Sequence, residues 1–268
     1  MKKIIVITGA NSGIGKKCAE ILSKEYKIYG TTFGDDEKNN LKTKYNLIPC
    51  DITNDKSVDV FFKKILSKEN RIDVLINCAG YGLGGGVEDT SIEEARHQFE
   101  VNFFGTHRIV KNVLPIMRKQ KFGRIITISS LASEVIIPFQ SFYSTSKMAL
   151  TGMMGAIRSE CKKFGIDSTT VHPGDVKSKF TINRKVAKAC TKGTPYYNEC
   201  MNSINTMKKD ERAGLDPNDV AKFVCNLVDQ RNLKPKYFIE PKYKFLMFAK
   251  RFMSDSLIEK IVEKMYLP

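Results

Sequence analysis

Long apolar runs are missing from this 268-residue sequence. The apolar stretch nearest the N-terminus, Ile4-Ile5-Val6-Ile7, is interrupted at once by Thr8 and Gly9. The core of a signal peptide needs about 7–15 apolar residues, and a membrane-spanning helix needs about 18 or more. The sequence therefore predicts neither kind of segment.

Metal-ligand and disulfide spacings are also missing. The seven cysteines are an odd number and include no C-x-x-C pair, which fits neither a disulfide framework nor a zinc knuckle. The three histidines, His97, His107 and His172, show no H-E-x-x-H spacing. We therefore expect a reduced, cytoplasmic protein without a bound metal.

Acidic residues are few relative to basic ones, with 29 Asp and Glu against 44 Lys and Arg, so the formal charge is +15. Most of the basic residues are lysines, whereas surfaces that read bases or grip phosphates bidentately favour arginine. A solvated lysine-rich surface is the preferred interpretation, and we expect no nucleic-acid partner.

Repeats and Gly/Ser-rich linkers are absent, which favours a single domain. Short β-branched runs alternate with amphipathic helical patterns, and each predicted strand is apolar along its length, which requires a parallel sheet covered on both faces. We predict an α/β fold with a doubly wound, seven-stranded parallel sheet, a Rossmann fold. The strands are expected at 3–8, 27–32, 45–50, 73–77, 123–129, 166–171 and 237–239, and the helices at 13–25, 55–68, 91–119, 141–164 and 217–228.

A glycine-rich turn follows the first predicted strand. It reads Thr8-Gly9-Ala10-Asn11-Ser12-Gly13-Ile14-Gly15 and leads directly into a helix. Glycines let the backbone turn tightly and bring its amides to a pyrophosphate at the helix N-terminus. Such a turn is weak evidence alone, but its position after the first strand favours a dinucleotide site.

Further motifs follow in order along the chain: Asn77-Cys78-Ala79-Gly80, Asn102, Ser130, Tyr143-x-x-x-Lys147 and Pro173-Gly174. With the glycine-rich turn, their order and spacing resemble the short-chain dehydrogenase/reductase family. The resemblance runs from residue 3 to about residue 180 and continues more weakly through the tail. The tail is similar to the C-terminal extension of the hydroxysteroid and retinol dehydrogenase-like branch.

Tyr143 and Lys147 lie one helical turn apart, so their side chains share a face. A tyrosine has a pKa of about 10 and needs a nearby cation to act as a base near neutrality. Ser130 ends a buried strand thirteen residues before Tyr143, at the sheet edge where ligands bind in this architecture. This spacing selects Ser130 over its neighbours Ser129 and Ser133.

The family resemblance assigns roles to these residues. It implies that Tyr143 is the general acid in reduction and the base in oxidation, and that Ser130 polarises the substrate oxygen. Lys147 is expected to lower the pKa of Tyr143 and to hold the nicotinamide ribose. Asn102 is expected to anchor a water molecule that relays protons to Lys147.

The resemblance also implies a set of dinucleotide contacts. Asp51 matches the residue that contacts the adenine, while Val176 and Ser178 match positions that hold the nicotinamide carboxamide. Cys78 departs from the family's usual Asn-Asn-Ala-Gly. The predicted cofactor-binding residues are Gly9, Ser12, Gly13, Ile14, Gly15, Thr32, Asp51, Ile52, Asn77, Ala79, Gly80, Tyr143, Lys147, Pro173, Gly174, Val176 and Ser178.

The end of the second predicted strand bears on the choice of cofactor. It reads Thr31-Thr32-Phe33-Gly34, without the acidic residue that binds the ribose 2′-hydroxyl of NAD, and Asp35 and Asp36 come later. The arginine expected near Phe33 in NADP-specific relatives is also missing. Because Thr32 can bond a phosphate and Lys16 or Lys17 can add charge, the sequence favours NADP(H) over NAD(H).

Two segments fall outside the strand-helix alternation. We predict a catalytic dinucleotide-binding domain at 1–240, with a substrate lid at 177–214, and an amphipathic extension at 241–268. The lid either steers an anionic substrate or is simply solvated. The tail is either a flap over the body, which is favoured, or a contact with an anionic membrane surface. Between Lys177 and Lys209, the basic residues of the lid are Lys177, Lys179, Arg184, Lys185, Lys188, Lys192, Lys208 and Lys209, against one acid, Glu199.

The resemblance thus implies an NAD(P)(H)-dependent oxidoreductase, a carbonyl reductase or secondary-alcohol dehydrogenase. It would transfer a hydride between nicotinamide and a small-molecule ketone or alcohol that is hydrophobic, and anionic or steroid-like. The alternative is a redox sensor that binds the dinucleotide without turnover. The intact Ser130, Tyr143, Lys147 and Asn102 argue against it, because a sensor needs no acid. The resemblance also implies a homodimer or homotetramer.

Overall fold

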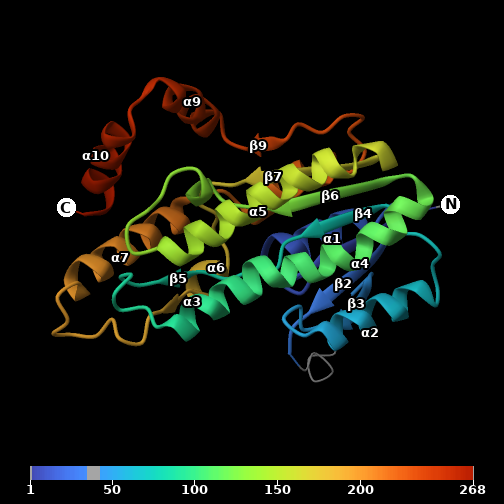
Figure 1. The fold of residues 1–268 in the computed structure, drawn as a ribbon, viewed down its shortest axis with the longest axis horizontal. Helices are drawn as coiled ribbons and strands as arrows, with labels where there is room; N and C mark the ends of the chain where they lie inside the picture. The colour runs from blue at the N-terminus through green and yellow to red at the C-terminus, as the bar shows by residue number, and fades with distance from the viewer. Residues whose placement is uncertain (1, 35–42, 268) are drawn as a thin grey trace.

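A seven-stranded parallel sheet forms the centre of the molecule, in the strand order β3-β2-β1-β4-β6-β7-β9. The computed structural model describes residues 2–34 and 43–267. The predicted Rossmann fold is confirmed, and every predicted strand is present (Figure 1). The strands are β1 Ile4–Thr8, β2 Lys27–Thr32, β3 Asn46–Pro49, β4 Val74–Asn77, β6 Gly123–Ile128, β7 Ile166–His172 and β9 Lys236–Phe238.

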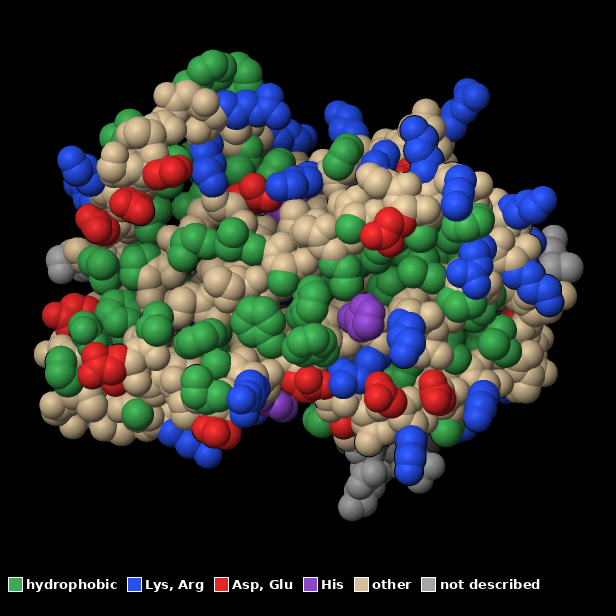
Figure 2. All heavy atoms as spheres, viewed as in Figure 1, with side chains coloured by type: hydrophobic (Ala, Val, Ile, Leu, Met, Phe, Trp, Pro, Cys, Tyr) green, Lys and Arg blue, Asp and Glu red, His purple; other side chains and the backbone are tan. Residues whose placement is uncertain are grey.

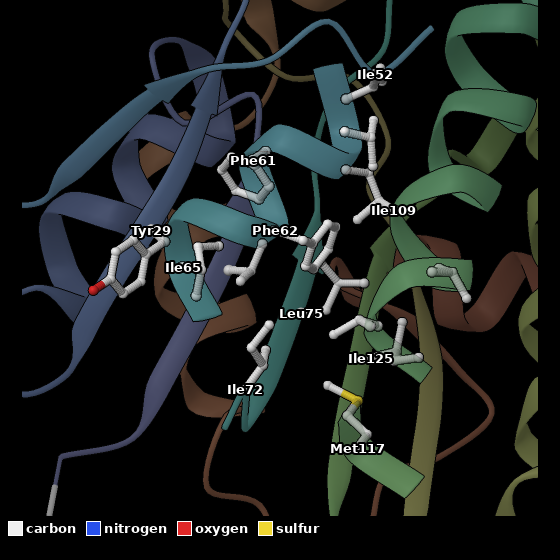
Figure 3. Packing of buried hydrophobic residues seen from close by; sticks show 14 of the residues in the cluster. Tyr29, Ile52, Phe61, Phe62, Ile65, Ile72, Leu75, Ile109, Met117 and Ile125 are labelled. Atoms are coloured by element: carbon white, nitrogen blue, oxygen red, sulfur yellow. The ribbon is translucent and has the colours of Figure 1, made fainter. Parts of the chain in front are cut away.

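Helices cover both faces of this sheet, and each face has its own hydrophobic core. Figure 3 shows one core, in which Phe61 and Ile65 of α2 and Met117 of α4 pack beside Leu75 and Ile125 of the sheet. On the other face α1 packs against α8. These helices are α1 Gly13–Leu22, α2 Asp55–Leu66, α4 Gly105–Gln120, α5 Ser141–Glu160 and α8 Pro217–Asn226.

The helix expected at 91–119 is not a regular α-helix throughout. α3 (Ile92–Phe99) is joined to α4 by a π-helical turn, Glu100–Phe104, which contains the buried Asn102. Such wide turns occur mostly as single turns within helices, often at functional sites. The π-helical turn places the Asn102 side chain against the backbone of Tyr81, beyond the end of β4.

The segment expected to form the lid contains two helices and a short strand. α6 (Phe180–Asn183) and α7 (Tyr197–Ala213) flank β8 (Lys185–Val186), which pairs in parallel with β5 (Leu83–Gly84). The buried guanidinium of Arg184 is paired with the carboxylate of Glu211 on α7. This ion pair ties the two halves of the segment together.

The tail forms two helices that differ in their packing. α10 (Asp255–Tyr266) packs against α7 through its buried residues Val262 and Tyr266. α9 (Pro241–Ala249) has no buried residue and lies at the outer edge of the molecule (Figure 1). A short 3₁₀ turn, Lys250–Phe252, follows α9. Among the described residues, no helix has both the length and the apolar character needed to span a bilayer.

Candidate active site

The glycine-rich turn leaves the N-terminus of α1 open. Gly9 and Gly13 have φ angles of 65° and 54°, in the left-handed region that favours glycine. A Cβ at Gly15 would overlap the carbonyl oxygen of Gly9, so a larger residue cannot fit there. Ser12 precedes the helix but makes no side-chain capping bond, and the first turn of α1 holds no acidic residue. The amides at this terminus can therefore receive an anion.

Hydrogen bonds fix the carboxyl ends of β1 and β4 beside this turn. The hydroxyl of Thr8 accepts from the amides of Cys78 and Ala79, at 3.0 and 3.1 Å. The side-chain amide of Asn77 donates to Thr127, while its buried Oδ1 has no protein partner in the described part of the chain. The Cys78 thiol contacts that of Cys18 and helps to raise the pKa of that buried group.

Tyr143 and Lys147 are both buried on α5, one turn apart as expected. The Lys147 ammonium lies 5.8 Å from the centre of the Tyr143 ring and donates to the carbonyl of Ile128 at 2.9 Å. Burial lowers the pKa of Lys147 to about 8 and raises the pKa of Tyr143 to about 12. Tyr143 is therefore a protonated phenol at neutral pH.

The positive charge that lowers the pKa of Tyr143 comes from a different residue than expected. A hydrogen bond with Ser130 and the positive charge of Arg184 lower the pKa of Tyr143, against the larger effect of burial. Lys147, which was expected to lower this pKa, is not among its main causes. Burial penalises the charged form of both groups, so Lys147 loses its proton more readily than an exposed lysine.

Ser130 lies two residues after the end of β6, in a loop whose backbone is held by hydrogen bonds. Its hydroxyl accepts from the amide of Ala132 at 3.1 Å, and its carbonyl accepts from the Ser133 hydroxyl at 2.7 Å. The ring of His172 lies 3.1 Å from the same carbonyl, and burial lowers its pKa to about 4. The neutral His172, which sequence reasoning left without a role, thus supports the Ser130 loop. Its only signal in the sequence is its place directly before Pro173.

Asn102 is held by three hydrogen bonds. Its side-chain amide donates to the carbonyl of Tyr81 and to the hydroxyl of Ser146, each at 3.1 Å, and its Oδ1 accepts from the Tyr81 amide. A Cβ at Gly80 would lie 3.0 Å from Oδ1 and 3.6 Å from the Lys147 ammonium nitrogen. The structure therefore places Asn102 beside Lys147, with its side chain engaged in positioning the Gly80 loop.

The residues expected at the adenine end lie at the edge of the sheet near β2 and β3. Asp51 accepts from the amide and hydroxyl of Thr53, at 2.9 and 2.7 Å. Lys16 and Lys17 lie 3.9 and 3.0 Å from Glu20. Thr32, at the end of β2, is buried, as is Ile52. Asp35 and Asp36 fall outside the described residues.

A cavity of about 690 Å³ brings many of the predicted residues together. Those that line it are Ile14, Gly80, Ser130, Tyr143, Lys147, Pro173, Gly174, Val176 and Ser178. The other predicted residues do not line it: Gly9, Ser12, Gly13, Gly15, Thr32, Asp51, Ile52, Asn77, Ala79 and Asn102. The cavity therefore corresponds to the reacting end of the predicted site and not to its adenine end.

The tail supplies one wall of this cavity. Its apolar lining residues are Leu246, Met253, Ile258, Ile261, Val262 and Met265. The ring of Tyr243 lies directly on Gly174, where a Cβ would overlap it. Sequence reasoning did not single out Tyr243, because nothing local indicates which face of α9 meets the sheet.

Carboxylates, rather than the basic residues of the lid, also reach the cavity. Asp175, Asp210, Glu211 and Glu240 line it, whereas none of the eight basic lid residues does. Burial, together with the charges of Asp210 and Glu211, raises the pKa of Asp175 to about 6. The lining favours the solvated interpretation of the lid. The described residues contain no cluster of three or more potential metal ligands.

Fold and site together define a doubly wound Rossmann protein with a half-buried serine and a buried tyrosine and lysine at the carboxyl edge of its sheet. This chain belongs to the short-chain dehydrogenase/reductase family, because the family model described as short chain dehydrogenase matches residues 3–189. The predicted family, which is a family of oxidoreductases, is confirmed.

Individual relatives extend the match through the tail. A 3-ketodihydrosphingosine reductase from Bacteroides thetaiotaomicron is 35% identical over 266 residues, covering 98% of both chains. The solved structure of a short-chain dehydrogenase from Streptomyces avermitilis has a TM-score of 0.80 and 25% identity, covering 97% of this chain and 96% of that one. The structure of ElxO with NADP bound has a TM-score of 0.74 and 26% identity, covering 91% of this chain and 99% of that one.

Proposed function

We propose that this protein is an NAD(P)(H)-dependent oxidoreductase that interconverts a ketone and a secondary alcohol. The observation that carries the proposal is the convergence of Ser130, Tyr143 and Lys147 on one cavity beside Ile14 and Gly80. Their hydroxyls and ammonium lie at the carboxyl edge of the parallel strands, where this architecture binds ligands.

The residues around the glycine-rich turn fit a dinucleotide. The uncapped N-terminus of α1, the close approach of Gly15 to Gly9 and the absence of an acid in the first turn all suit a pyrophosphate. The unpartnered Oδ1 of Asn77 leaves one acceptor at the edge of the sheet for a ligand. Lys147 and Ser178 would hold the ribose and carboxamide of the nicotinamide end.

The chain's own groups account for the movement of the proton. A bound nicotinamide would supply or accept the hydride at the reacting carbon. In reduction, Tyr143 is protonated at neutral pH and can donate to the developing alkoxide, while the Ser130 hydroxyl stabilises the same oxygen. In oxidation, Tyr143 must lose its proton, and the hydrogen bond with Ser130 and the positive charge of Arg184 favour the phenolate.

NADP(H) is proposed as the preferred cofactor. The end of β2 offers Thr32 and no carboxylate through Gly34, so no described acid there would repel a 2′-phosphate. The solved relative ElxO carries NADP, which supports this choice. Lys16 and Lys17 lie on the neighbouring helix α1, where either could add positive charge.

A large, predominantly apolar ketone is proposed as the substrate. The cavity of about 690 Å³ exceeds the needs of a small ketone, and its tail wall is lined by aliphatic and methionine side chains. The name of the Bacteroides relative, 3-ketodihydrosphingosine reductase, supports a lipid-like ketone. The carboxylates of Asp175 and Asp210 line the cavity without an ion pair among the described residues, which favours a neutral or cationic polar end over an anionic one.

The test combines binding and turnover. Fluorescence titration with NADPH and NADH is followed by reduced-nicotinamide absorbance against ketosteroids, long-chain ketones, small ketones and keto acids. We expect Tyr143→Phe to bind the dinucleotide normally and to lose turnover, while Tyr26→Phe, a surface control, keeps both. Tight binding without turnover of any carbonyl would indicate a sensor, and no binding of either dinucleotide would overturn the proposal.

A further inference from the structure

α9 is an apolar helix that the protein leaves uncovered. Tyr243, Phe245, Leu246, Met247 and Phe248 belong to it, yet none of its residues is buried. Phe245 is 72% exposed and Phe248 is 59% exposed, and Phe252 in the next turn is 78% exposed. Figure 2 shows hydrophobic side chains at the outermost point of the molecule over this helix. Contiguous aromatic surface of this kind marks an interaction site.

The charged residues of α9 and the turn after it are all basic. Residues 241–252 contain four basic residues, Lys242, Lys244, Lys250 and Arg251, and no acid. Lys242 pairs with Glu240 and Lys250 donates to a backbone carbonyl, whereas Lys244 and Arg251 have no ion pair within the described chain. Figure 2 shows basic side chains directly beneath the hydrophobic cap. Aromatic groups with basic neighbours match the headgroup region of an anionic bilayer.

A second copy of this chain fits the surface less well. Two-fold related copies would bring the same four basic residues of each protomer face to face, because a closed dimer uses the same patch twice. The acids of the tail, which could neutralise them, all belong to α10. The formal charge of +15 on the whole chain also attracts it to negative surfaces.

The segment also forms part of the cavity wall. Tyr243, Leu246 and Lys250 line the cavity, while Phe245, Phe248 and Phe252 are exposed to solvent. One short stretch of chain thus separates the site of Tyr143 from the exposed aromatic surface. Only the width of α9 would separate a molecule that leaves a bilayer at this surface from the apolar wall of the cavity.

We propose that residues 241–252 dock on an anionic lipid bilayer, so that an apolar ketone enters the cavity beneath α9 directly from the membrane. The entry route rests on the proposed function, whereas the docking does not depend on it.

The test of docking is co-sedimentation with vesicles of phosphatidylcholine and phosphatidylserine in a roughly 3:1 ratio. We expect the wild-type chain to bind these vesicles, to bind less as salt increases and to bind pure phosphatidylcholine vesicles at least roughly tenfold more weakly. The triple variant Phe245→Ser, Phe248→Ser, Phe252→Ser should lose at least roughly tenfold in affinity. The exposed control set Val60→Ser, Leu66→Ser, Ile92→Ser should not.

A charge-reversed pair gives an independent arm. Lys244→Glu with Arg251→Glu should also weaken vesicle binding at least roughly tenfold, while Lys56→Glu with Lys111→Glu changes it little. Failure of the wild type to bind, or equal losses in the control sets, would overturn the proposal. Concentration-dependent self-association that disappears in the phenylalanine variant, without vesicle binding, would assign the surface to a second copy and overturn it too.

Turnover of a water-soluble ketone separates docking from catalysis. The phenylalanine variant should keep dinucleotide binding and this turnover, but lose activity towards an apolar ketone presented in anionic vesicles. If the variant binds vesicles poorly and the wild type turns over no ketone, docking stands and the proposed function fails. If vesicle-bound ketone is reduced equally by both proteins, the entry route fails.

Discussion

The two walls of the cavity are built differently. Tyr143, Lys147 and Ser130 lie on or beside core elements, and neighbouring backbone groups hold Lys147 and Ser130 in place. The opposite wall comes from the tail, where α9 has no buried residue but contacts Gly174 through Tyr243, and α10 is anchored through Val262 and Tyr266. The wall that carries Ser130, Tyr143 and Lys147 is therefore well supported by core elements, whereas the tail wall, which would contact the substrate, has fewer buried residues to hold it.

This difference follows from what each wall must do. Acid–base groups must lie within hydrogen-bond reach of the reacting oxygen, which requires support from packed elements. A wall that admits bulky substrates must open, so it is drawn from the least stable part of the fold. The tail gains its stability from few contacts, and we expect its substitutions to affect substrate entry more than folding.

The largest contrast is expected in stability. Phe61→Ala, at a fully buried position of α2, should lower the free energy of unfolding by about 3–5 kcal/mol. Phe248→Ala, on the exposed face of α9, should change it by less than about 0.5 kcal/mol. Urea unfolding followed by circular dichroism measures both. Similar losses for the two variants would mean that α9 is packed as tightly as the core.

Removal of the Ser130 hydroxyl tests the wall that core elements support. Ser130→Ala should lower kcat by about 10²–10³-fold, because one hydrogen bond to the reacting oxygen is lost. Ser129→Ala is the matched control. Its hydroxyl lies 3.2 Å from the carbonyl of Lys147 and bonds within the protein, so a loss below about tenfold is expected. Steady-state kinetics with a reducible ketone would reject the assignment if the two variants behaved alike.

Asp175 lies between the two walls and gives a pH-dependent prediction. The pKa of Asp175 in the folded protein, about 6, lies above its reference value of 3.8, because burial favours the protonated carboxyl. The protein is therefore most stable with respect to this group below about pH 4, and it loses that stability as pH rises through 6. Asp175→Asn should therefore stabilise the protein by up to about 2 kcal/mol at pH 8 and by about a third of that at pH 4.5. Unfolding free energies at both pH values check this, and an equal effect at both would contradict it.

Two glycines provide the smallest expected effect. Gly152→Ala in α5 has open space around the added methyl group and should stabilise the protein by about 0.5–1 kcal/mol. Gly15→Ala in α1 should instead destabilise the protein and weaken dinucleotide binding, because its Cβ would overlap Gly9. Thermal unfolding with and without NADPH distinguishes the two variants. Stabilisation by Gly15→Ala would show that the turn is looser than described.

The fold could be predicted because its signals are local. β1 is a run of Ile and Val that ends at Thr8, and the Asn54 side chain caps α2 by accepting from the amide of Ser57. The π-helical turn was missed because its cause lies elsewhere in the chain. Asn102 bonds to the backbone of Tyr81, and helical periodicity contains no trace of that contact.

The residues proposed for chemistry were recognisable as motifs, since Tyr143 and Lys147 are four residues apart and Ser130 ends a strand. The substrate side was not. Arg184 and Glu211 pair across the lid, and Tyr243 meets Gly174 from the far end of the chain. Such contacts depend on tertiary packing, so the composition of the lid could not show that Asp210 and Glu211 line the cavity while its eight basic residues between 177 and 209 do not.

The central claim is that the cavity around Tyr143 carries out hydride transfer to a ketone. Its most direct test is to incubate the protein with reduced cofactor deuterated at nicotinamide C4 on either face and a ketone that it consumes, and to analyse the product by mass spectrometry. The account predicts one deuterium on the carbinol carbon from one of the two labelled faces, and no labelled product from Tyr143→Phe. Alcohol without deuterium from either face, or labelled alcohol formed equally by the variant, would contradict it.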